Sequence, residues 1–205
     1  MVNLFRQKYV FVVVFVFCSL SGKTQMLDSL ALSQQPIFVW EQIDTISNKE
    51  NVFRLKIKRK MPDNFDSLIL TFPNLQELTM QNMRLKTIPQ TVFLLTNLTI
   101  LNVENNKIEE LPAEIGNLYH LERLILNRNY IAFLPKEIAL LKNLTYLDMW
   151  SNNIIELPEE ISALTETLKI IDMRVILMSD ERKILMQALL PKTEFLFSKS
   201  CNCKM

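Results

Sequence analysis

A 23-residue period runs through the middle of this 205-residue chain and constrains its fold more than any other feature. The pattern Leu-x-x-Leu-x-Leu begins at Leu75, Leu98, Leu121 and Leu144, with methionine or valine in place of the last leucine in three of these four units. A Leu-Pro or Ile-Pro pair and a later hydrophobic residue also recur in every unit. Repetition at this spacing is typical of a solenoid, in which successive units stack to complete a shared core.

Each unit is expected to contain one short strand, because the Leu-x-Leu alternation places neighbouring side chains on opposite faces. An asparagine follows the strand in three units, at Asn106, Asn129 and Asn152, and Met83 holds this position in the first. An asparagine amide both donates and accepts hydrogen bonds, so these three residues predict an internal ladder between coils. The proline suits the start of a short helix or turn on the opposite side of each coil.

The unit L-x-x-L-x-L-x-x-N-x-I-x-x-L-P-x-x-I-x-x-L resembles the leucine-rich repeat, and most closely its plant intracellular Ras-group class, which is also common in bacterial proteins. The resemblance implies an α/β solenoid with a short curved parallel sheet on the concave face and short helices or turns on the convex face. Full units begin at 75, 98, 121 and 144 and half-units at 52 and 168, so the repeats are expected to span residues 52–178.

Both ends of the repeat region are expected to carry helical caps, because an open solenoid end would expose its core. Residues 22–51 form the amino-terminal cap, in which Pro36 to Ser47 reads as an amphipathic helix. Residues 179–205 form the carboxyl-terminal cap and tail. There a helix is expected to begin at Ser179 and stop before Pro191, and the alternation of Phe195 and Phe197 predicts a short strand.

Residues 1–21 have the layout of a secretory signal peptide, with basic Arg6 and Lys8, an apolar run and then small residues. The apolar stretch of twelve residues would span about 18 Å as a helix, against a hydrocarbon core of roughly 30 Å. We therefore expect a secreted, periplasmic or cell-surface protein without a stable membrane span after processing. An uncleaved anchor, a buried strand and a lipid on Cys18 remain as alternatives.

The composition argues against several classes of function. The two glycines, Gly22 and Gly116, lie too far apart for a phosphate-binding loop, and the single histidine, His120, cannot form a multi-histidine metal site. A net charge of +1 gives no case for nucleic acid. We expect no cofactor and no metal, although Cys201 and Cys203 could pair with each other, pair between molecules, bind a soft metal or simply lie in a frayed tail. Replacing Gly116 by alanine is expected to cost little stability.

The sequence offers no arrangement of residues for catalysis, so we expect a protein that is not an enzyme. His120 falls at a turn position of the repeat, which neighbouring units fill with asparagine. The carboxylate pair Glu109 and Glu110 falls in a solvated outer loop, on the far side of the coil from the concave face. A second pair, Glu159 and Glu160, follows a repeat proline and suits a helix start.

The concave face is the predicted binding surface, because core packing does not dictate its side chains. Arginine, tyrosine and tryptophan, which are enriched in interface hot spots, gather there in the third and fourth full units beside exposed isoleucines. The predicted ligand-binding residues are Ile100, Arg123, Ile125, Arg128, Tyr146, Asp148 and Trp150. Alternatively, Tyr146 and Trp150 could only pack on each other or on the carboxyl-terminal cap.

These features predict a monomeric, non-enzymatic module that recognises an unidentified protein or peptide outside the cell or at its surface. The alternative is an intracellular regulatory scaffold of the Ras-group type, and the fate of the leader distinguishes the two. Six strands about 4.8 Å apart offer on the order of 400 Å² of concave face, whereas a standard interface uses about 800 Å² per partner. The strands alone therefore predict a contact of modest affinity.

Overall fold

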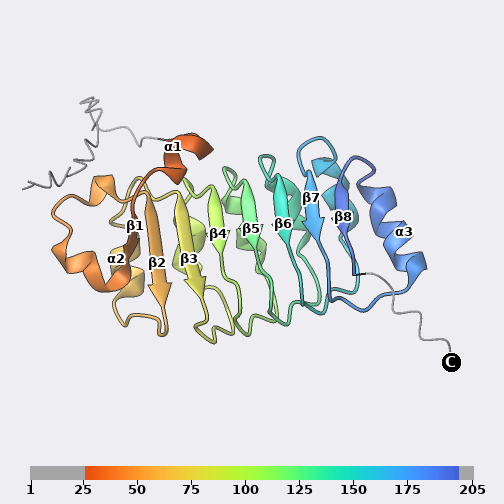
Figure 1. The fold of residues 1–205 in the computed structure, drawn as a ribbon, viewed down its shortest axis with the longest axis horizontal. Helices are drawn as coiled ribbons and strands as arrows, with labels where there is room; N and C mark the ends of the chain where they lie inside the picture. The colour runs from red at the N-terminus through yellow and green to blue at the C-terminus, as the bar shows by residue number, and fades with distance from the viewer. Residues whose placement is uncertain (1–25, 199–205) are drawn as a thin grey trace, which may run out of the picture.

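The computed structural model describes residues 26–198, which form one open sheet of eight parallel strands in sequence order (Figure 1). Each strand is three to five residues long, and all of their carboxyl ends lie along the same edge of the sheet. The strands are β1 (Ile37–Val39), β2 (Arg54–Lys58), β3 (Glu77–Gln81), β4 (Ile100–Asn102), β5 (Arg123–Ile125), β6 (Tyr146–Asp148), β7 (Ile170–Asp172) and β8 (Glu194–Leu196). The predicted solenoid is confirmed.

The 23-residue period sets the register of the sheet. Leu78, Leu101, Leu124 and Leu147 face one another on successive strands, and all four are fully buried. Between β6 and β7 the offset becomes 24, so that Leu147 faces Ile171. The leucine pattern thus builds a continuous apolar core behind the sheet.

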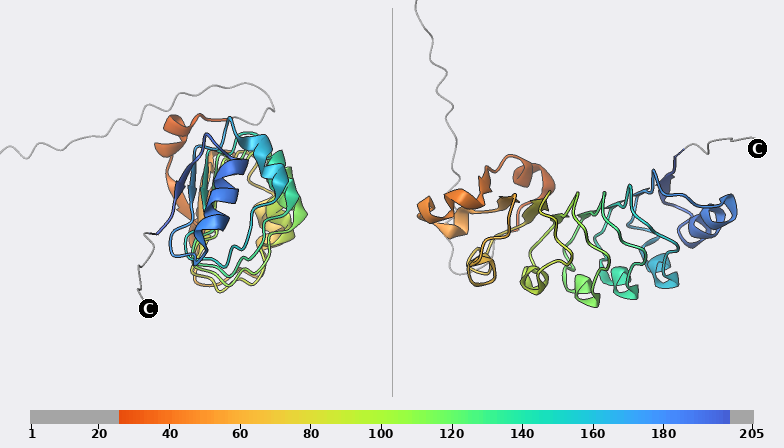
Figure 2. Two further views of the ribbon diagram at one scale, coloured as in Figure 1. Left: turned by 90° about the vertical axis from the view of Figure 1, so that its right-hand side faces the viewer. Right: turned by 90° about the horizontal axis from the view of Figure 1, so that it is seen from below.

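Short 3-10 helices line the side of the coils opposite the sheet (Figure 2). They are η3 (Gln90–Leu94), η4 (Ala113–Asn117), η5 (Lys136–Leu140) and η6 (Glu159–Leu164). The repeat prolines stand at the residue just before each of these helices, with φ between −56° and −75°. The fixed φ of proline turns the chain into the helix, and no hydrogen-bond donor is lost from the helix itself.

Gly116 lies in η4 and is packed more tightly than expected. A Cβ added there would lie 2.9 Å from Leu140 Cδ1 and 3.1 Å from the backbone oxygen of Glu137. The exposed Leu140 side chain can move aside, but the backbone oxygen is fixed by η5. Because η4 lies this close to η5, an alanine at position 116 would have to displace its neighbours slightly, and the cost of that substitution stays a prediction.

The asparagine side chains join neighbouring coils inside the solenoid. Asn129 Oδ1 accepts from the N–H of Ile108 at 3.0 Å, and its Nδ2 donates to the carbonyls of Val103 at 3.1 Å and Leu126 at 2.8 Å. Asn106 and Asn152 make the corresponding bonds one coil before and one coil after. Each amide therefore fastens its own coil to the preceding one.

A left-handed backbone conformation recurs where each coil turns away from the sheet. Positive φ values between 53° and 69° stand at Arg59, Asn82, Asn105, Arg128, Ser151 and Val175, at the same 23- or 24-residue spacing. Asparagine tolerates this region, whereas a β-branched residue such as Val175 is strained in it. The last coil therefore carries a strained residue at its turn.

The amino-terminal cap differs from the predicted single helix at Pro36 to Ser47. Ile37–Val39 instead forms β1, which pairs with β2, and the 3-10 helix η1 follows at Trp40–Thr45. The free edge of β2 offers backbone hydrogen bonds that an isolated helix could not use, and the β-branched Ile37 and Val39 suit a strand. The remaining helices of this end are α1 (Ser29–Ser33), η2 (Lys49–Asn51) and α2 (Phe65–Ile69).

The carboxyl-terminal end has the expected elements. Helix α3 runs from Asp180 to Leu189, with the Ser179 side chain accepting from the N–H of Arg182, and β8 follows beside β7. Met186 and Leu190 face the core, while Ile184 and Leu185 are exposed. Among residues 26–198 no helix is long and apolar enough to cross a membrane.

Candidate functional site

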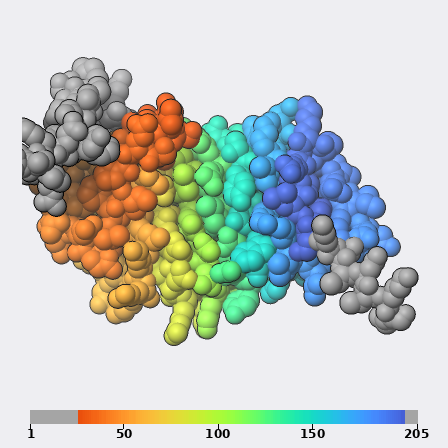
Figure 3. All heavy atoms as spheres, viewed as in Figure 1, coloured from red at the N-terminus to blue at the C-terminus, as the bar shows by residue number. Residues whose placement is uncertain are grey.

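The structure brings the predicted ligand-binding residues together on three adjacent strands and just beyond their ends. The face of the sheet that carries these strands is turned toward the viewer in Figure 3. Ile100, Arg123 and Tyr146 stand in register on β4, β5 and β6, and Ile125 and Asp148 stand in register two residues further along. The remaining two residues, Arg128 and Trp150, lie just beyond the carboxyl ends of β5 and β6.

Two arginines stack on two aromatic rings across the β5–β6 pair. The Arg123 guanidinium carbon lies 5.2 Å from the centre of the Tyr146 ring, and that of Arg128 lies 4.5 Å from the centre of the Trp150 ring. Both arginines are exposed, and both rings are half-buried. Within residues 26–198 neither arginine has a carboxylate within 4.0 Å, whereas Arg54 and Arg174 are paired with Glu77 and Asp172.

Asp148 lies below this surface rather than on it. Only 8% of the residue is exposed; its Oδ2 accepts from Asn127 Nδ2 at 2.7 Å, and its Oδ1 accepts from the Trp150 N–H at 3.1 Å. Burial raises the pKa of the Asp148 carboxyl above its usual range, and these hydrogen bonds oppose the rise. The carboxylate therefore fixes the turn that presents Trp150 instead of offering itself to a ligand.

The same turn is built on two other strands. Asn102 Oδ1 accepts from the N–H of Glu104 at 2.9 Å, and Asp172 Oδ1 accepts from the N–H of Arg174 at 3.1 Å. The signal in the sequence is Asn or Asp at the last strand position, two residues before the side chain that it positions. This pattern went unused in the sequence analysis.

Burial is also the main reason why the pKa of the Tyr146 phenol is raised, and the neighbouring Asp148 and Asp172 carboxylates raise it further. The phenol therefore stays neutral at physiological pH and can donate a hydrogen bond. A neutral ring also preserves the stack with Arg123, since the arginine is attracted to its π face.

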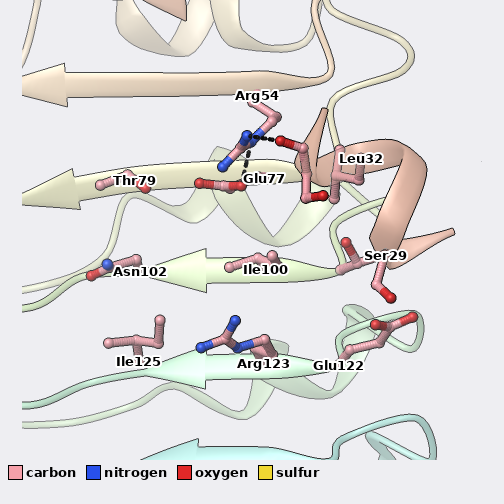
Figure 4. Close-up of a pocket in the computed structure, with 12 residues that line it drawn as sticks. Ser29, Leu32, Arg54, Glu77, Thr79, Ile100, Asn102, Glu122, Arg123 and Ile125 are labelled. Atoms are coloured by element: carbon pink, nitrogen blue, oxygen red, sulfur yellow. Dashed lines mark hydrogen bonds and ion pairs between the residues drawn. The ribbon is translucent and has the colours of Figure 1, made fainter. Parts of the chain in front are cut away.

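A hollow of about 240 Å³ adjoins this surface under α1 (Figure 4). Helix α1 crosses the amino-terminal ends of the strands, and Ile100, Arg123 and Ile125 lie on the strands beside it. No pattern in the sequence had indicated this part of the surface. The full lining is Ser29, Leu32, Ser33, Arg54, Glu77, Thr79, Thr99, Ile100, Asn102, Glu122, Arg123 and Ile125.

Arg54 on β2 and Gln76, just before β3, hold α1 and its flanks in place. The fully buried Gln76 accepts from the N–H of Leu27 at 3.0 Å and donates to the Leu27 carbonyl at 3.2 Å. Arg54 donates to the carbonyls of Ser33 at 3.0 Å and Gln35 at 3.2 Å. Because these bonds join residues 19 to 49 positions apart, no local pattern could reveal them.

Comparison with known families agrees with this geometry. A family model described as leucine rich repeat matches residues 73–131 and again 96–154. These coils are leucine-rich repeats. No curated protein sequence matches the chain closely enough to count as a relative.

Several solved leucine-rich-repeat structures are similar to this chain. A leucine-rich-repeat protein of Leptospira interrogans is 29% identical with a TM-score of 0.65, over 87% of this chain and 47% of that one. The ectodomain of the Arabidopsis thaliana receptor kinase GASSHO1/SCHENGEN3, in complex with CASPARIAN STRIP INTEGRITY FACTOR 2, is 28% identical with a TM-score of 0.52, over 75% and 19%. The plant peptide hormone receptor RGFR1 in complex with RGF2 shares the fold at 24% identity and a TM-score of 0.53, over 71% and 25%. This chain thus spans less than half of each of these proteins.

The histidine and the two glutamate pairs that were considered for catalysis lie off the strands of the sheet. His120 is half-buried beside the Tyr119 ring, with ring centres 4.6 Å apart, and the carboxylates at 109, 110, 159 and 160 are exposed. The part of the chain from 26 to 198 holds no group of three or more His, Cys, Asp or Glu residues that could bind a metal ion. Cys201 and Cys203 lie outside the described residues.

Proposed function

We propose that this protein is an exported or cell-surface recognition module that binds a protein or peptide through the concave face of its repeats. The observation that carries the proposal is the pair of arginine–aromatic stacks, Arg123 on Tyr146 and Arg128 on Trp150, on an open sheet face. Core packing does not require any of these four side chains, and Arg, Tyr and Trp are the residue types that dominate binding energy. Stacking also limits their rotamers before binding, which lowers the entropic cost of ordering them.

The comparisons support a binding role. One similar structure is a receptor ectodomain in complex with a second molecule, and the leucine-rich-repeat fold typically serves protein interaction without catalysis. On this surface Ile100 and Ile125 add apolar area between the polar groups. We propose that all of these predicted residues except Asp148 contact the ligand, and that Asp148 positions Trp150.

The proposed organisation is a signal peptide at 1–21, an amino-terminal cap at 22–51, repeats at 52–178 and a carboxyl-terminal cap and tail at 179–205. The leader lies outside the described residues, and its apolar run is what supports export. The alternative function is an intracellular scaffold of the Ras-group type, which the resemblance of the repeat unit favours. Mass spectrometry of the mature protein decides between them, since loss of about 21 residues fits export only.

Capture experiments test the concave face directly. The protein and the double variant Arg123→Ala/Trp150→Ala are used as bait on the surface fraction of the producing cell, and the affinity for each identified partner is then measured. We expect the double variant to lose the partner, because Arg and Trp hot spots each contribute about 2 kcal/mol or more. Lys136→Ala, on the exposed convex side, is the control that keeps binding. A partner bound equally well by all three proteins would contradict the proposed site.

A further inference from the structure

We propose that the segment bound by the concave face is an acidic, extended peptide, whose carboxylates pair with Arg123 and Arg128. This inference rests on the proposed function and specifies its ligand. It follows from the two stacks, from the distribution of charge over the sheet face, and from the apolar side chain between the two arginines.

The stacks leave the hydrogen-bonding edges of both arginines available. A guanidinium that lies over an aromatic ring uses its face, while its N–H donors point outward in the plane. That plane matches a carboxylate, which can accept two parallel hydrogen bonds from one arginine. No carboxylate of residues 26–198 lies within ion-pair distance of Arg123 or Arg128. The N–H donors of both arginines are therefore available to a ligand.

The charge distribution on this face favours a negative ligand. Two of its carboxylates, Glu77 and Asp172, already pair with Arg54 and Arg174, and Asp148 is buried. Lys56 and Lys58 on β2 add two more positive charges, and Glu104, Glu122 and the exposed Glu194 on β8 are the carboxylates that remain. Lys56, Lys58, Arg123 and Arg128 therefore outnumber these three carboxylates on the described part of this face.

The spacing of the arginines sets the form of the ligand. Arg123 and Arg128 are five residues apart, so their Cα atoms lie at most about 17 Å from each other. The half-buried Ile125 stands between them, and Ile100 lies beside Arg123 on β4. A matching segment has one carboxylate near each end and an apolar side chain in the middle. The hollow under α1 gives the end near Arg123 room to enter (Figure 4).

Heptapeptide pools test this inference. One fluorescent pool has glutamate near both ends and leucine in the middle, and two matched pools carry glutamine or lysine in place of both glutamates. Binding is measured by anisotropy for the protein and for Arg123→Gln/Arg128→Gln. The control Arg84→Gln/Arg182→Gln removes two exposed arginines that lie off this face. Polygalacturonate serves as a competitor that carries carboxylates without a peptide backbone.

We expect the glutamate pool to bind about tenfold or more tightly than the glutamine pool, and the Arg123→Gln/Arg128→Gln variant to lose this preference. Added salt should weaken the binding, and the control should bind like the parent. Equal binding of the glutamate and glutamine pools, binding of no pool, or stronger binding of polygalacturonate than of the peptides would overturn the inference.

The two proposals fail in different ways. If Trp150→Ala abolishes capture of a partner while peptide charge has no effect, the concave site stands and the acidic ligand is wrong. If the partner survives Arg123→Ala/Trp150→Ala, the proposed function itself is wrong.

Discussion

Replacing Asn129 by alanine should destabilise the protein by about 2–4 kcal/mol, and the ladder geometry gives this figure. The residue is 4% exposed, and its side chain makes four bonds to backbone groups, of which the one to the Asn127 carbonyl is the longest at 3.3 Å. Two of its acceptors keep a second donor, because Asn106 Nδ2 also bonds to Val103 and Asn152 Nδ2 also bonds to Leu126. Only the N–H of Ile108 loses its partner completely, at a cost of about 1–3 kcal/mol, and the two shared bonds add the rest.

The same reasoning ranks the three ladder residues. Asn106 Oδ1 accepts from both Met83 at 3.0 Å and Leu85 at 3.1 Å, so Asn106→Ala leaves two N–H groups unpaired. Asn152→Ala leaves one, the N–H of Ile131. We therefore expect the cost to be largest at Asn106 and smaller, and similar, at Asn129 and Asn152.

Guanidinium chloride unfolding, followed by circular dichroism, measures these free energies. The matched control is Asn143→Ala, since Asn143 also bonds to a backbone carbonyl, that of Tyr119, but at an exposed site. Its loss should cost less than about 1 kcal/mol. The ladder argument is refuted if Asn129→Ala costs no more than this control, or if Asn106→Ala is the mildest of the three.

Three further predictions concern single residues. Val175→Asn should stabilise the protein by about 1 kcal/mol, because φ of 58° strains a β-branched residue; a lower melting temperature would contradict this. Gly116→Ala should cost up to about 1 kcal/mol through the contact with the Glu137 oxygen, and thermal melts of Gly116→Ala/Leu140→Ala should show that adding Leu140→Ala does not recover it, because the backbone oxygen remains. Asp148 has a raised folded-state pKa, so its contribution is most favourable below the ordinary value of 3.8 and is lost as pH rises through the folded pKa. The parent should therefore gain stability relative to Asp148→Asn on acidification from neutral pH, and a pH-independent difference would show that the carboxyl is not perturbed.

Much of the fold could be predicted from the sequence, because a strict period fixes which residues face one another. Leu101 and Leu124 are 23 residues apart and stand in register on adjacent strands. Outside the repeats no period fixes the register, so the segment that forms β1 was expected to be helical. Ile37 and Val39 join the sheet because β2 offers a free edge.

The candidate site was only partly predictable. Alternation assigns Arg123 and Tyr146 to the same face, and register makes them neighbours, so their stack follows from the period. Alternation shows which face a side chain points to, but not how far it is buried. Asp148 points away from the core, yet it is buried and bonds to Asn127 and Trp150. The hollow under α1 depends on the long-range bonds of Gln76, which no spacing rule contains.

The asparagine ladder also determines how this protein can change in length. Each amide binds its own coil and the one before it, and Asn152 repeats the bonds of Asn129 one unit later. A duplicated segment 121–143 would therefore meet the same partners on both sides and add one strand to the sheet. The sheet can therefore be lengthened in whole coils without a new core.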